Sequence, residues 1–495
     1  MSAPVSDTLP REIRFFHRGR VVRLENVAPT RSVLDWLRED QRCVGTKEGC
    51  NEGDCGACTV VVGELPAHTD SADQAVRGLR LRPVNACIKF MPSLHGKALF
   101  TVEDLRGAAG LHPAQQALVD CHGSQCGFCT PGFAMTLWCS YENHRGAGTR
   151  PDRAQLADEL AGNLCRCTGY RPILDAGAQM FDLAPAALDT APVIAALRAI
   201  ADGIPASAPR TLAELARRYA ASPQARLVAG GTDVGLWVTK QLRDLGEVIP
   251  VTEIDELKTV THDDGALRIG AGVSLEVAWG ALAARAPALT EAWRRFASPP
   301  IRHAGTLGGN VANGSPIGDS APVLMALDAQ LELRQGERVR RLPLDDFYTG
   351  YLANRLEPGE FIQAVVVPEA AFARRIRAYK ISKRFDSDIS AVFAALAITL
   401  DDGTVADVRL AFGGMAATVR RAATAEAVLR GQPWSAATLA AAQAALARDF
   451  TPLDDMRASA AYRLRVAQNL LRRFWLETQD DASAEPAATS IWSVA

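Results

Sequence analysis

The sequence has no excess of charge of either sign and no long, uninterrupted hydrophobic run. Its 54 lysine and arginine residues nearly balance its 56 aspartate and glutamate residues, so we expect no overall electrostatic attraction to nucleic acid. The longest apolar stretch, Ile389 to Leu400, is interrupted by Ser390 and Thr399 and is shorter than the ~20 residues that cross a bilayer. The N-terminal residues contain neither an apolar signal core nor an early twin-arginine pair, which predicts a cytoplasmic protein.

Cysteine is absent from the whole chain after Cys167, although the sequence contains 11 cysteines. All of them lie between Cys43 and Cys167. A disulfide framework is not expected in a large cytoplasmic chain, so the spacing of the cysteines is more informative than their number. The length of 495 residues, 48% of them hydrophobic, predicts about three globular domains.

The first cysteine group has the spacing C-x4-C-x2-C. Cys50, Cys55 and Cys58 occupy these positions, and Cys87 follows further along the chain. This is the ligand spacing of plant-type [2Fe–2S] clusters. The glycines within residues 49–58 provide positive-φ positions and close backbone approach, and we expect backbone amides to point at the sulfurs. The alternatives are a zinc site and buried structural thiols, but zinc usually takes two C-x2-4-C pairs.

The second cysteine group combines a C-x2-C pair, Cys126 and Cys129, with a C-x-C pair, Cys165 and Cys167. Taken alone, this set also fits zinc, but its presence beside the first group favours a second iron–sulfur cluster. Pro131 and the helical spacing after it predict that Cys129 lies at a helix N-terminus, where the helix dipole suits an anionic cluster.

Outside the two groups, Cys43, Cys121 and Cys139 are predicted to be small buried hydrophobic residues. Pro113 and the residues after it predict a further helix before the second group.

The rest of the chain mixes short strand-like runs with helical stretches, which predicts α+β domains. Residues 183–210 are rich in Ala, Pro and Asp and are predicted to be a linker carrying a short helix. The glycine-bearing segments 227–233 and 306–319 are suited to close approach of a pyrophosphate, although each also fits an ordinary hairpin turn. Segment 270–275 begins like a dinucleotide fingerprint but has leucine at the third glycine position, so it predicts a strand-to-helix turn. No Rossmann motif is present, and a flavin would need another binding fold.

The motifs GCNEGDCGACTV, NACIKF, QCGFCTPGF and NLCRCTGYRPI closely resemble the iron–sulfur region of the xanthine oxidase family of molybdenum hydroxylases. The resemblance implies a β-grasp, ferredoxin-like domain over residues 11–95 and a helical bundle over residues 96–182, each holding one [2Fe–2S] cluster. Gln125 matches a residue that faces the pterin of the molybdenum cofactor across an interface. The implied ligands are Cys50, Cys55, Cys58 and Cys87 for the first cluster, and Cys126, Cys129, Cys165 and Cys167 for the second.

The motifs RLVAGGTD, FASPPIRHAGTLGGNVANGSPIGDSAP and AYKISKRFDSDIS resemble the FAD domain of the same family, which is of the vanillyl-alcohol-oxidase type. The resemblance places an FAD-binding domain at residues 211–370 and a C-terminal α+β flavin-subunit domain at residues 371–480. Tyr351 matches a tyrosine that borders the nicotinamide site. The implied FAD-binding residues are Arg226, Leu227, Val228, Ala229, Gly230, Gly231, Thr232, Asp233, Phe296, Thr306, Leu307, Gly308, Gly309, Asn310, Asp319, Ile362 and Lys380.

The resemblance also implies a division of labour between two polypeptides. A molybdopterin-binding large subunit would oxidise hypoxanthine and xanthine to urate, while this chain passes the electrons to FAD and NAD+ and contributes no catalytic residue to the purine chemistry. The implied assembly has two small and two large subunits. Three alternatives remain: a molybdenum hydroxylase acting on an aldehyde or N-heterocycle, a non-enzymatic redox sensor, and a zinc-stabilised scaffold.

Overall fold

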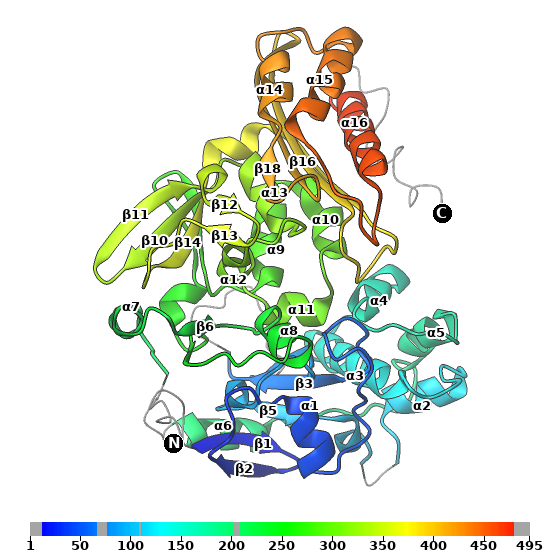
Figure 1. Cartoon of the computed structure of the whole chain (residues 1–495). Helices are drawn as coiled ribbons and strands as arrows, with labels where there is room; N and C mark the ends of the chain where they lie inside the picture. The colour runs from blue at the N-terminus through cyan, green and yellow to red at the C-terminus, as the bar shows by residue number, and fades with distance from the viewer. Residues whose placement is uncertain (1–11, 67–76, 108–109, 202–207, 480–495) are drawn as a thin grey trace. The chain divides into compact units, whose positions relative to one another are not determined.

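The computed structural model describes residues 12–66, 77–107, 110–201 and 208–479 (Figure 1). The chain forms two compact units, and each is described by itself. The first unit consists of Met1–Glu256 with Ala297–Gly305, and the second of Leu257–Phe296 with Thr306–Ala495. The predicted FAD-binding domain, residues 211–370, contributes to both units. No helix in the described ranges has the length and apolarity that a bilayer crossing requires.

The first unit begins with a mixed five-stranded sheet. Its strand order is β2-β1-β5-β3-β4, and β1 pairs with β5 in parallel while its pairing with β2 is antiparallel. Alternating apolar residues of β1 put Ile13 and Phe15 into the core, where the Phe15 ring meets the Trp36 ring edge to face at 5.2 Å. The elements are β1 (Glu12–His17), β2 (Arg20–Glu25), α1 (Val33–Asp35), the π-helical η1 (Trp36–Asp40), β3 (Thr59–Glu64), β4 (Arg80–Asn85), η2 (Met91–Leu94), β5 (Ala98–Phe100) and η3 (Val102–Asp104).

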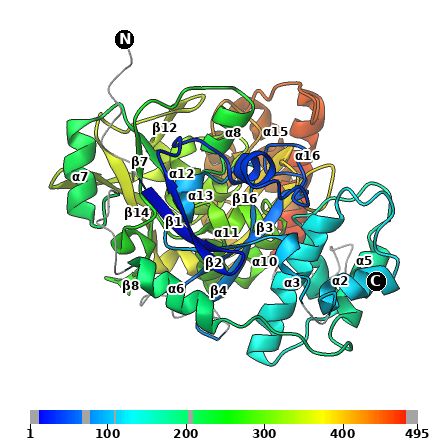
Figure 2. The same cartoon turned by 90° about the horizontal axis from the view of Figure 1, so that it is seen from below.

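Four helices follow: α2 (Pro113–Asp120), α3 (Thr130–Ala147), α4 (Arg153–Leu160) and α5 (Arg171–Gln179). The predicted helices after Pro113 and after Cys129 are therefore confirmed. Helix α3 begins at Thr130 with Pro131 in its first turn and ends at Gly148 in the left-handed conformation, a typical helix stop. Figures 1 and 2 show α2, α3 and α5 lying together.

The remainder of the first unit joins a short parallel strand pair to helices. The predicted linker contains α6, and β6 pairs with β7 in parallel. The elements are α6 (Ala191–Ala201), α7 (Leu212–Ala221), β6 (Arg226–Val228), α8 (Val234–Thr239), β7 (Val248–Pro250) and α11 (Pro299–Ala304). A 3-10 turn, η4 (Asp255–Lys258), spans the boundary between the units.

The second unit contains a five-stranded antiparallel sheet in the order β11-β10-β14-β9-β8. As predicted, segment 270–275 turns from strand β9 into helix α9. The elements are β8 (Val260–Asp263), β9 (Ala266–Gly270), α9 (Leu275–Arg285), η5 (Pro287–Leu289), α10 (Thr290–Arg295), α12 (Leu307–Asn313), α13 (Ser320–Ala326), β10 (Gln330–Gln335), β11 (Arg338–Pro343), η6 (Leu344–Asp346), β12 (Tyr348–Gly350), β13 (Ala353–Asn354) and β14 (Phe361–Pro368).

A second sheet of this unit has the order β15-β16-β17-β18 and packs against helices α14 to α16. The helical spacing of Tyr462, Val466, Leu470 and Phe474 predicts one packed face on this sheet's last helix. Leu470 and Phe474 are buried, but Tyr462, in the first turn of α16, is 49% exposed, so the prediction is wrong for Tyr462. The elements are η7 (Glu369–Ala373), β15 (Arg375–Ile381), β16 (Val392–Asp401), β17 (Thr404–Gly413), β18 (Arg420–Arg421), α14 (Ala423–Leu429), α15 (Ala436–Asp449) and α16 (Ala460–Glu477).

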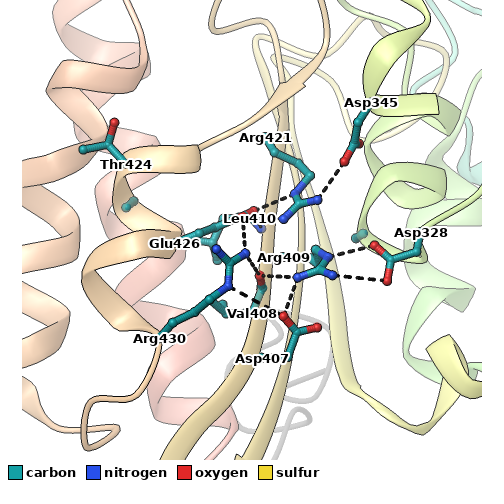
Figure 3. A network of polar contacts seen from close by, with 12 residues as sticks. Asp328, Asp345, Asp407, Val408, Arg409, Leu410, Arg421, Thr424, Glu426 and Arg430 are labelled. Carbon is teal, nitrogen blue, oxygen red and sulfur yellow. Dashed lines mark hydrogen bonds and ion pairs between the residues drawn. The ribbon is translucent and has the colours of Figure 1, made fainter. Parts of the chain in front are cut away.

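A charged network ties this second sheet to the segment before it (Figure 3). Arg409 donates to Asp328 at 2.7 Å, and Arg421 pairs with Asp345 at 2.7 Å and with the buried Glu426. Burial raises the pKa of Asp328, but hydrogen bonds from Arg409 and Arg374 outweigh it, so this pKa lies below its usual value. Because paired charges tolerate burial that single charges do not, the network fixes residues 328–345 against β17 and β18.

Candidate functional site

Backbone amides surround the first two cysteines of the first group. The amides of Asp54 and Cys55 each donate to Cys50 Sγ at 3.3 Å, and the amide of Cys50 donates to Cys55 Sγ at 3.3 Å. The hydrogen bond from the Cys55 thiol, followed by those from the backbone, lowers the pKa of Cys50 to about 5. The predicted amide-to-sulfur contacts are therefore present, and they favour a thiolate.

The other two cysteines of this group are buried. Cys58 is 3% exposed and Cys87 is 0% exposed. A hydrogen bond from the Cys87 thiol lowers the pKa of Cys58 and raises that of Cys87. Both thiols also interact electrostatically with Cys50, so the four sulfurs form one group made of two pairs.

Glycine shapes the first loop in two ways. Gly53 and Gly56 adopt φ of 81° and 68°, which glycine tolerates far better than other residues. Gly49 has no positive φ, but a Cβ there would lie 2.7 Å from Cys55 Sγ. The loop therefore needs glycine both for its turns and for room beside the sulfurs. Asn51, with φ of 56°, is a left-handed position that the sequence analysis missed.

The second group also brings its sulfurs together in pairs. Cys126 Sγ lies 3.6 Å from Cys167 Sγ, which is 3.9 Å from Cys165 Sγ. Burial, with Cys165 as the next cause, raises the pKa of Cys129 to about 12. Cys126 and Cys167 are exposed, and the neighbouring Phe128 side chain is 49% exposed.

The donor sets fit two-iron clusters. In each group four thiols meet as two pairs, and a [2Fe–2S] cluster takes four cysteine ligands, two for each iron. Within the described ranges, no set of three or more His, Cys, Asp or Glu side chains has the arrangement of a single-ion site. The paired thiols and the amides beside them are therefore the features that fit a two-iron cluster.

A hydrogen-bonded bridge joins the two groups. The amide of Leu164, which precedes Cys165, donates to the carbonyl oxygen of Cys55 at 2.9 Å. Beside it, the buried Asn163 donates from Nδ2 to the carbonyl of Gly56 at 3.0 Å and to Thr59 Oγ1 at 3.1 Å. One hydrogen bond thus links the backbone of a first-group cysteine to the residue next to a second-group cysteine.

Close backbone packing holds this bridge. A Cβ at Gly56 would lie 2.1 Å from the carbonyl oxygen of Gly162, and one at Gly132 would lie 2.2 Å from that of Gly56. Such approaches exclude any side chain. The Asn163 amide oxygen accepts a hydrogen bond from Thr136 Oγ1 at 2.7 Å, which anchors the bridge to α3.

The first predicted flavin segment lies against the first group within the same unit. Residues 226–233 run from β6 through a turn into α8. From α8, Thr239 Oγ1 donates to the carbonyl of Asn51 at 2.8 Å, and a Cβ at Gly231 would lie 3.2 Å from the carbonyl oxygen of Ile88. Asn51 and Ile88 directly follow Cys50 and Cys87 in sequence.

Gly230 has a structural role besides the predicted one. A Cβ at this position would lie 1.6 Å from the carbonyl oxygen of Ala304, so the close approach of α11 already requires glycine here. A bulky substitution at Gly230 would disturb this packing whether or not a pyrophosphate binds. In the same segment, burial raises the pKa of Asp233.

The second predicted flavin segment, in the second unit, opens a helix and forms no hairpin. Thr306 caps α12, with its Oγ1 accepting from the amide of Gly309 at 3.3 Å. The amide of Leu307 donates to Val273 O, and that of Gly308 donates to Ala271 O. Asn310 lies on the same short helix.

Asp319 and Lys380 form a buried ion pair in the second unit. Lys380 Nζ donates to Asp319 Oδ2 at 2.6 Å, and both residues are at most 4% exposed. Ser390, which the sequence analysis did not select, completes the cluster: it accepts from Lys380 at 3.0 Å and donates to Asp319 at 2.7 Å. Lys380 is therefore buried and paired, and it is not the solvated surface lysine that its charge alone would predict.

The last three predicted residues of this unit occupy different surroundings. The Phe296 ring stacks on Trp279 with centroids 5.3 Å apart, and Ile362 lies buried in β14. Tyr351 is 67% exposed between β12 and β13. The hydrogen bonds and ion pairs of the described ranges connect neither Tyr351 nor Ile362 to the Asp319 cluster.

The cysteines outside the two groups differ from one another. Cys43 and Cys139 are buried, as predicted. Cys121 is only partly buried, and its thiol donates to Gln179 Oε1 at 2.7 Å, so the expectation of a fully buried side chain was wrong there. Sequence reasoning also missed Asn163, whose only signal is its place two residues before Cys165.

The fold and the paired thiols define a protein with two iron–sulfur modules and a flavin module. Residues 15–91 match the 2Fe-2S iron-sulfur cluster binding domain, and residues 101–178 match the [2Fe-2S] binding domain. Residues 203–370 match the FAD binding domain in molybdopterin dehydrogenase, and residues 377–478 match the CO dehydrogenase flavoprotein C-terminal domain. These four domains fit the iron–sulfur/FAD subunit of the xanthine oxidase family and confirm the predicted multidomain α+β fold class.

The chain is also similar to individual proteins. The chain is 32% identical to the xanthine dehydrogenase of Emericella nidulans over 94% of its own length and 38% of that protein, and 29% identical to aldehyde oxidase 2 of Rattus norvegicus over 96% of its own length and 39% of that protein. It thus spans well under two thirds of these relatives. A solved structure of reconstituted CO dehydrogenase from Oligotropha carboxidovorans matches with a TM-score of 0.51 and 28% identity, covering 55% of this chain and 96% of that one.

Proposed function

We propose that this chain is the electron-transfer subunit of a molybdenum hydroxylase. Electrons would come from a molybdopterin-binding partner subunit, pass from the second cysteine group to the first, and leave through FAD to NAD+. The observation that carries the proposal is the serial arrangement inside the first unit: the bridge from Leu164 to Cys55 O, and the contact from Thr239 to Asn51 O. The second cysteine group contacts the first through Leu164, which precedes Cys165, and the helix after the first flavin segment contacts the first group through Asn51, which follows Cys50.

The chain's own residues would hold and orient the carriers. The eight paired cysteines would ligate two [2Fe–2S] clusters, with backbone amides such as that of Asp54 favouring the anionic sulfurs. Residues 226–233 and 306–310, with Asp319, Phe296, Ile362 and Lys380, would bind FAD, and Tyr351 would border NAD+. When bound, the clusters carry single electrons and the flavin combines two of them for hydride transfer.

The different exposure of the two groups supports the direction. Cys126 and Cys167 are exposed, and so are the neighbouring Gln125 and Phe128, which makes this surface suited to a partner carrying the molybdenum site. Cys58 and Cys87 are buried, which suits an internal carrier. We propose that Gln125 faces the partner's pterin.

The proposed substrate is hypoxanthine or xanthine, oxidised to urate on the partner subunit. Support comes from the similarity to a xanthine dehydrogenase at 32% identity, and we propose the small subunit of a bacterial enzyme with two small and two large subunits in the cytoplasm. An aldehyde or N-heterocycle is the second candidate, favoured by the similarity to an aldehyde oxidase over 96% of the chain.

Removal of one cysteine from each group tests the cluster assignment. Cys55→Ala and Cys167→Ala should each abolish one of two iron–sulfur signals in electron paramagnetic resonance (EPR) of the reduced chain, because thiolate ligation requires all four donors. Cys121→Ala is the matched control, since this partly buried thiol lies outside both groups, and it should keep both signals. Two unchanged signals in either test variant would refute the ligand assignment.

The partner and the substrate need a separate experiment. The chain alone should reduce an artificial acceptor with NADH and should not hydroxylate purines, whereas the complex with its partner should turn over hypoxanthine and xanthine. Turnover of an aldehyde or N-heterocycle alone by the complex would replace the purine assignment with the second candidate. Purine hydroxylation by the isolated chain would contradict the division of labour.

A further inference from the structure

Three hydrogen bonds close a ring beside Cys165. The amide of Cys165 donates to Tyr170 Oη at 2.9 Å, and the amide of Tyr170 donates to Thr168 Oγ1 at 3.3 Å. Thr168 Oγ1 lies 3.0 Å from Cys165 Sγ, and the amide of Thr168 donates to the same sulfur at 3.4 Å. Thr168 therefore approaches this sulfur with both its backbone and its side chain.

The ring fixes the direction of the Thr168 hydroxyl. Because its oxygen already accepts from the Tyr170 amide, its single proton remains for the sulfur. A thiolate ligand can only accept, so the contact between Thr168 and Cys165 becomes an O–H···S hydrogen bond when Cys165 binds iron. The partner of the Thr168 proton thus follows from the chemistry of the two atoms.

The backbone holds this ring in an uncommon conformation. Gly169 has φ of 73°, and Tyr170 has φ of 68° and ψ of −35°, a region that residues other than glycine rarely occupy. These two residues turn the phenol back over Cys165 at the start of α5, where the Tyr170 ring meets that of Phe133 with centroids 6.4 Å apart. A tyrosine in such a rare conformation indicates that the placement of its phenol beside Cys165 is important.

We propose that Thr168 is a positioning residue that raises the reduction potential of the second cluster by donating its hydroxyl proton to Cys165 Sγ. This inference rests on the proposed function, in which Cys165 is a cluster ligand. Reduction adds negative charge to a cluster, and a hydrogen-bond donor aimed at a ligand sulfur stabilises the more negative state. Cys165 also follows Leu164, whose amide contacts Cys55 O, so the tuned ligand lies on the route to the first group.

A pair of substitutions isolates the hydroxyl. Thr168→Val keeps the β-branched shape and the backbone amide but removes the donor, whereas Thr168→Ser keeps the donor. EPR-monitored redox titration of the holoprotein should show a lower midpoint potential for the second cluster in Thr168→Val and a potential close to wild type in Thr168→Ser. The first cluster is an internal control in the same molecule, and its potential should stay constant.

The outcomes separate this inference from the proposed function. Iron content and the number of EPR signals in the wild-type chain test the cluster assignment, independently of any potential. With both clusters present, an unchanged second potential in Thr168→Val, or equal shifts in the valine and serine variants, would overturn the role of the hydroxyl. If Thr168→Val does not assemble the cluster, Thr168→Ala removes the same donor with less bulk.

Vibrational spectroscopy gives a second measure that does not depend on activity. Resonance Raman spectra of the wild-type and serine proteins should show a shift of iron–cysteine sulfur modes between H2O and D2O, because the hydroxyl proton exchanges. That shift should shrink in the variants without a hydroxyl, where only the backbone amides of Cys167 and Thr168 still donate to Cys165. Identical solvent shifts in all four proteins would contradict the proposal.

Discussion

The two cysteine groups each contain four thiols, but their surroundings are opposite. In the first group, Cys58 and Cys87 are almost fully buried, and backbone amides reach Cys50. In the second group, Cys126 and Cys167 are exposed. Solvent exposure and hydrogen bonds to sulfur are a protein's main means of setting cluster potentials, so clusters bound by these two groups would differ in potential although each has four cysteine ligands.

The two loops are also held by different parts of the chain. The first loop relies on glycine backbone, with Gly56 packed against Gly162. The second relies on side chains, because the Thr168 and Tyr170 hydroxyl groups both form hydrogen bonds with Cys165. We therefore expect the first group to respond most to added bulk and the second to loss of single polar groups.

The largest expected effect is that of bulk in the first loop. Gly56→Val places Cβ 2.1 Å from the Gly162 carbonyl oxygen and forces a branched residue into φ of 68°, so we expect a loss of more than ~4 kcal/mol in the free energy of unfolding. The variant should fail to fold its first unit or to retain either cluster, as measured by iron content and circular dichroism.

Gly96→Ala is the control for conformation alone. Gly96 also has positive φ, of 74°, but nothing lies within 4 Å of its added Cβ. This variant should lose only ~1 kcal/mol and keep both clusters. Equal losses of unfolding free energy in the two variants would show that the close packing of Gly56 against Gly162 does not stabilise the first unit.

The sequence alone predicts some features of these sites and not others. The spacing of the cysteines and the proline after Cys129 predicted both groups and helix α3, because ligand spacing and helix starts are local properties. The sequence did not predict the Asn163 bridge, whose partners Gly56 and Thr59 lie more than a hundred residues away. Nor did it predict that Asp319 and Lys380 pair in the interior with Ser390, since burial is decided by tertiary packing.

An intermediate effect is expected from chelation. Because Cys126 and Cys167 are exposed while Cys58 and Cys87 are buried, an iron chelator should remove the second EPR signal several-fold faster than the first. Binding of the partner subunit should slow the second loss alone. If the two signals disappear at the same rate in the free chain, then burial of the ligands does not protect the first cluster.

The smallest expected effect comes from pH and concerns the sheet of the first group. His17 is 2% exposed, and its Nδ1 lies 3.0 Å from the carbonyl oxygen of Leu99, while its buried Nε2 has no hydrogen-bond partner among the described residues. Burial is the largest cause that lowers the pKa of His17 below its usual value of 6.5. The folded chain therefore binds this proton more weakly than the unfolded chain.

The sign of the pH effect follows from that difference. The stabilisation by neutral His17 is complete above about pH 6.5 and is lost as the pH falls from there toward the folded pKa, by at most ~1.4 kcal/mol for each pH unit. His17→Asn keeps a donor for Leu99 O but does not titrate, so urea midpoints of the apo chain measured between pH 7.5 and 5.5 should fall less steeply in this variant. If the urea midpoint falls equally steeply with pH in both proteins, His17 is not the cause of the pH dependence. The exposure of the cysteines would then remain the difference between the two groups that these predictions test.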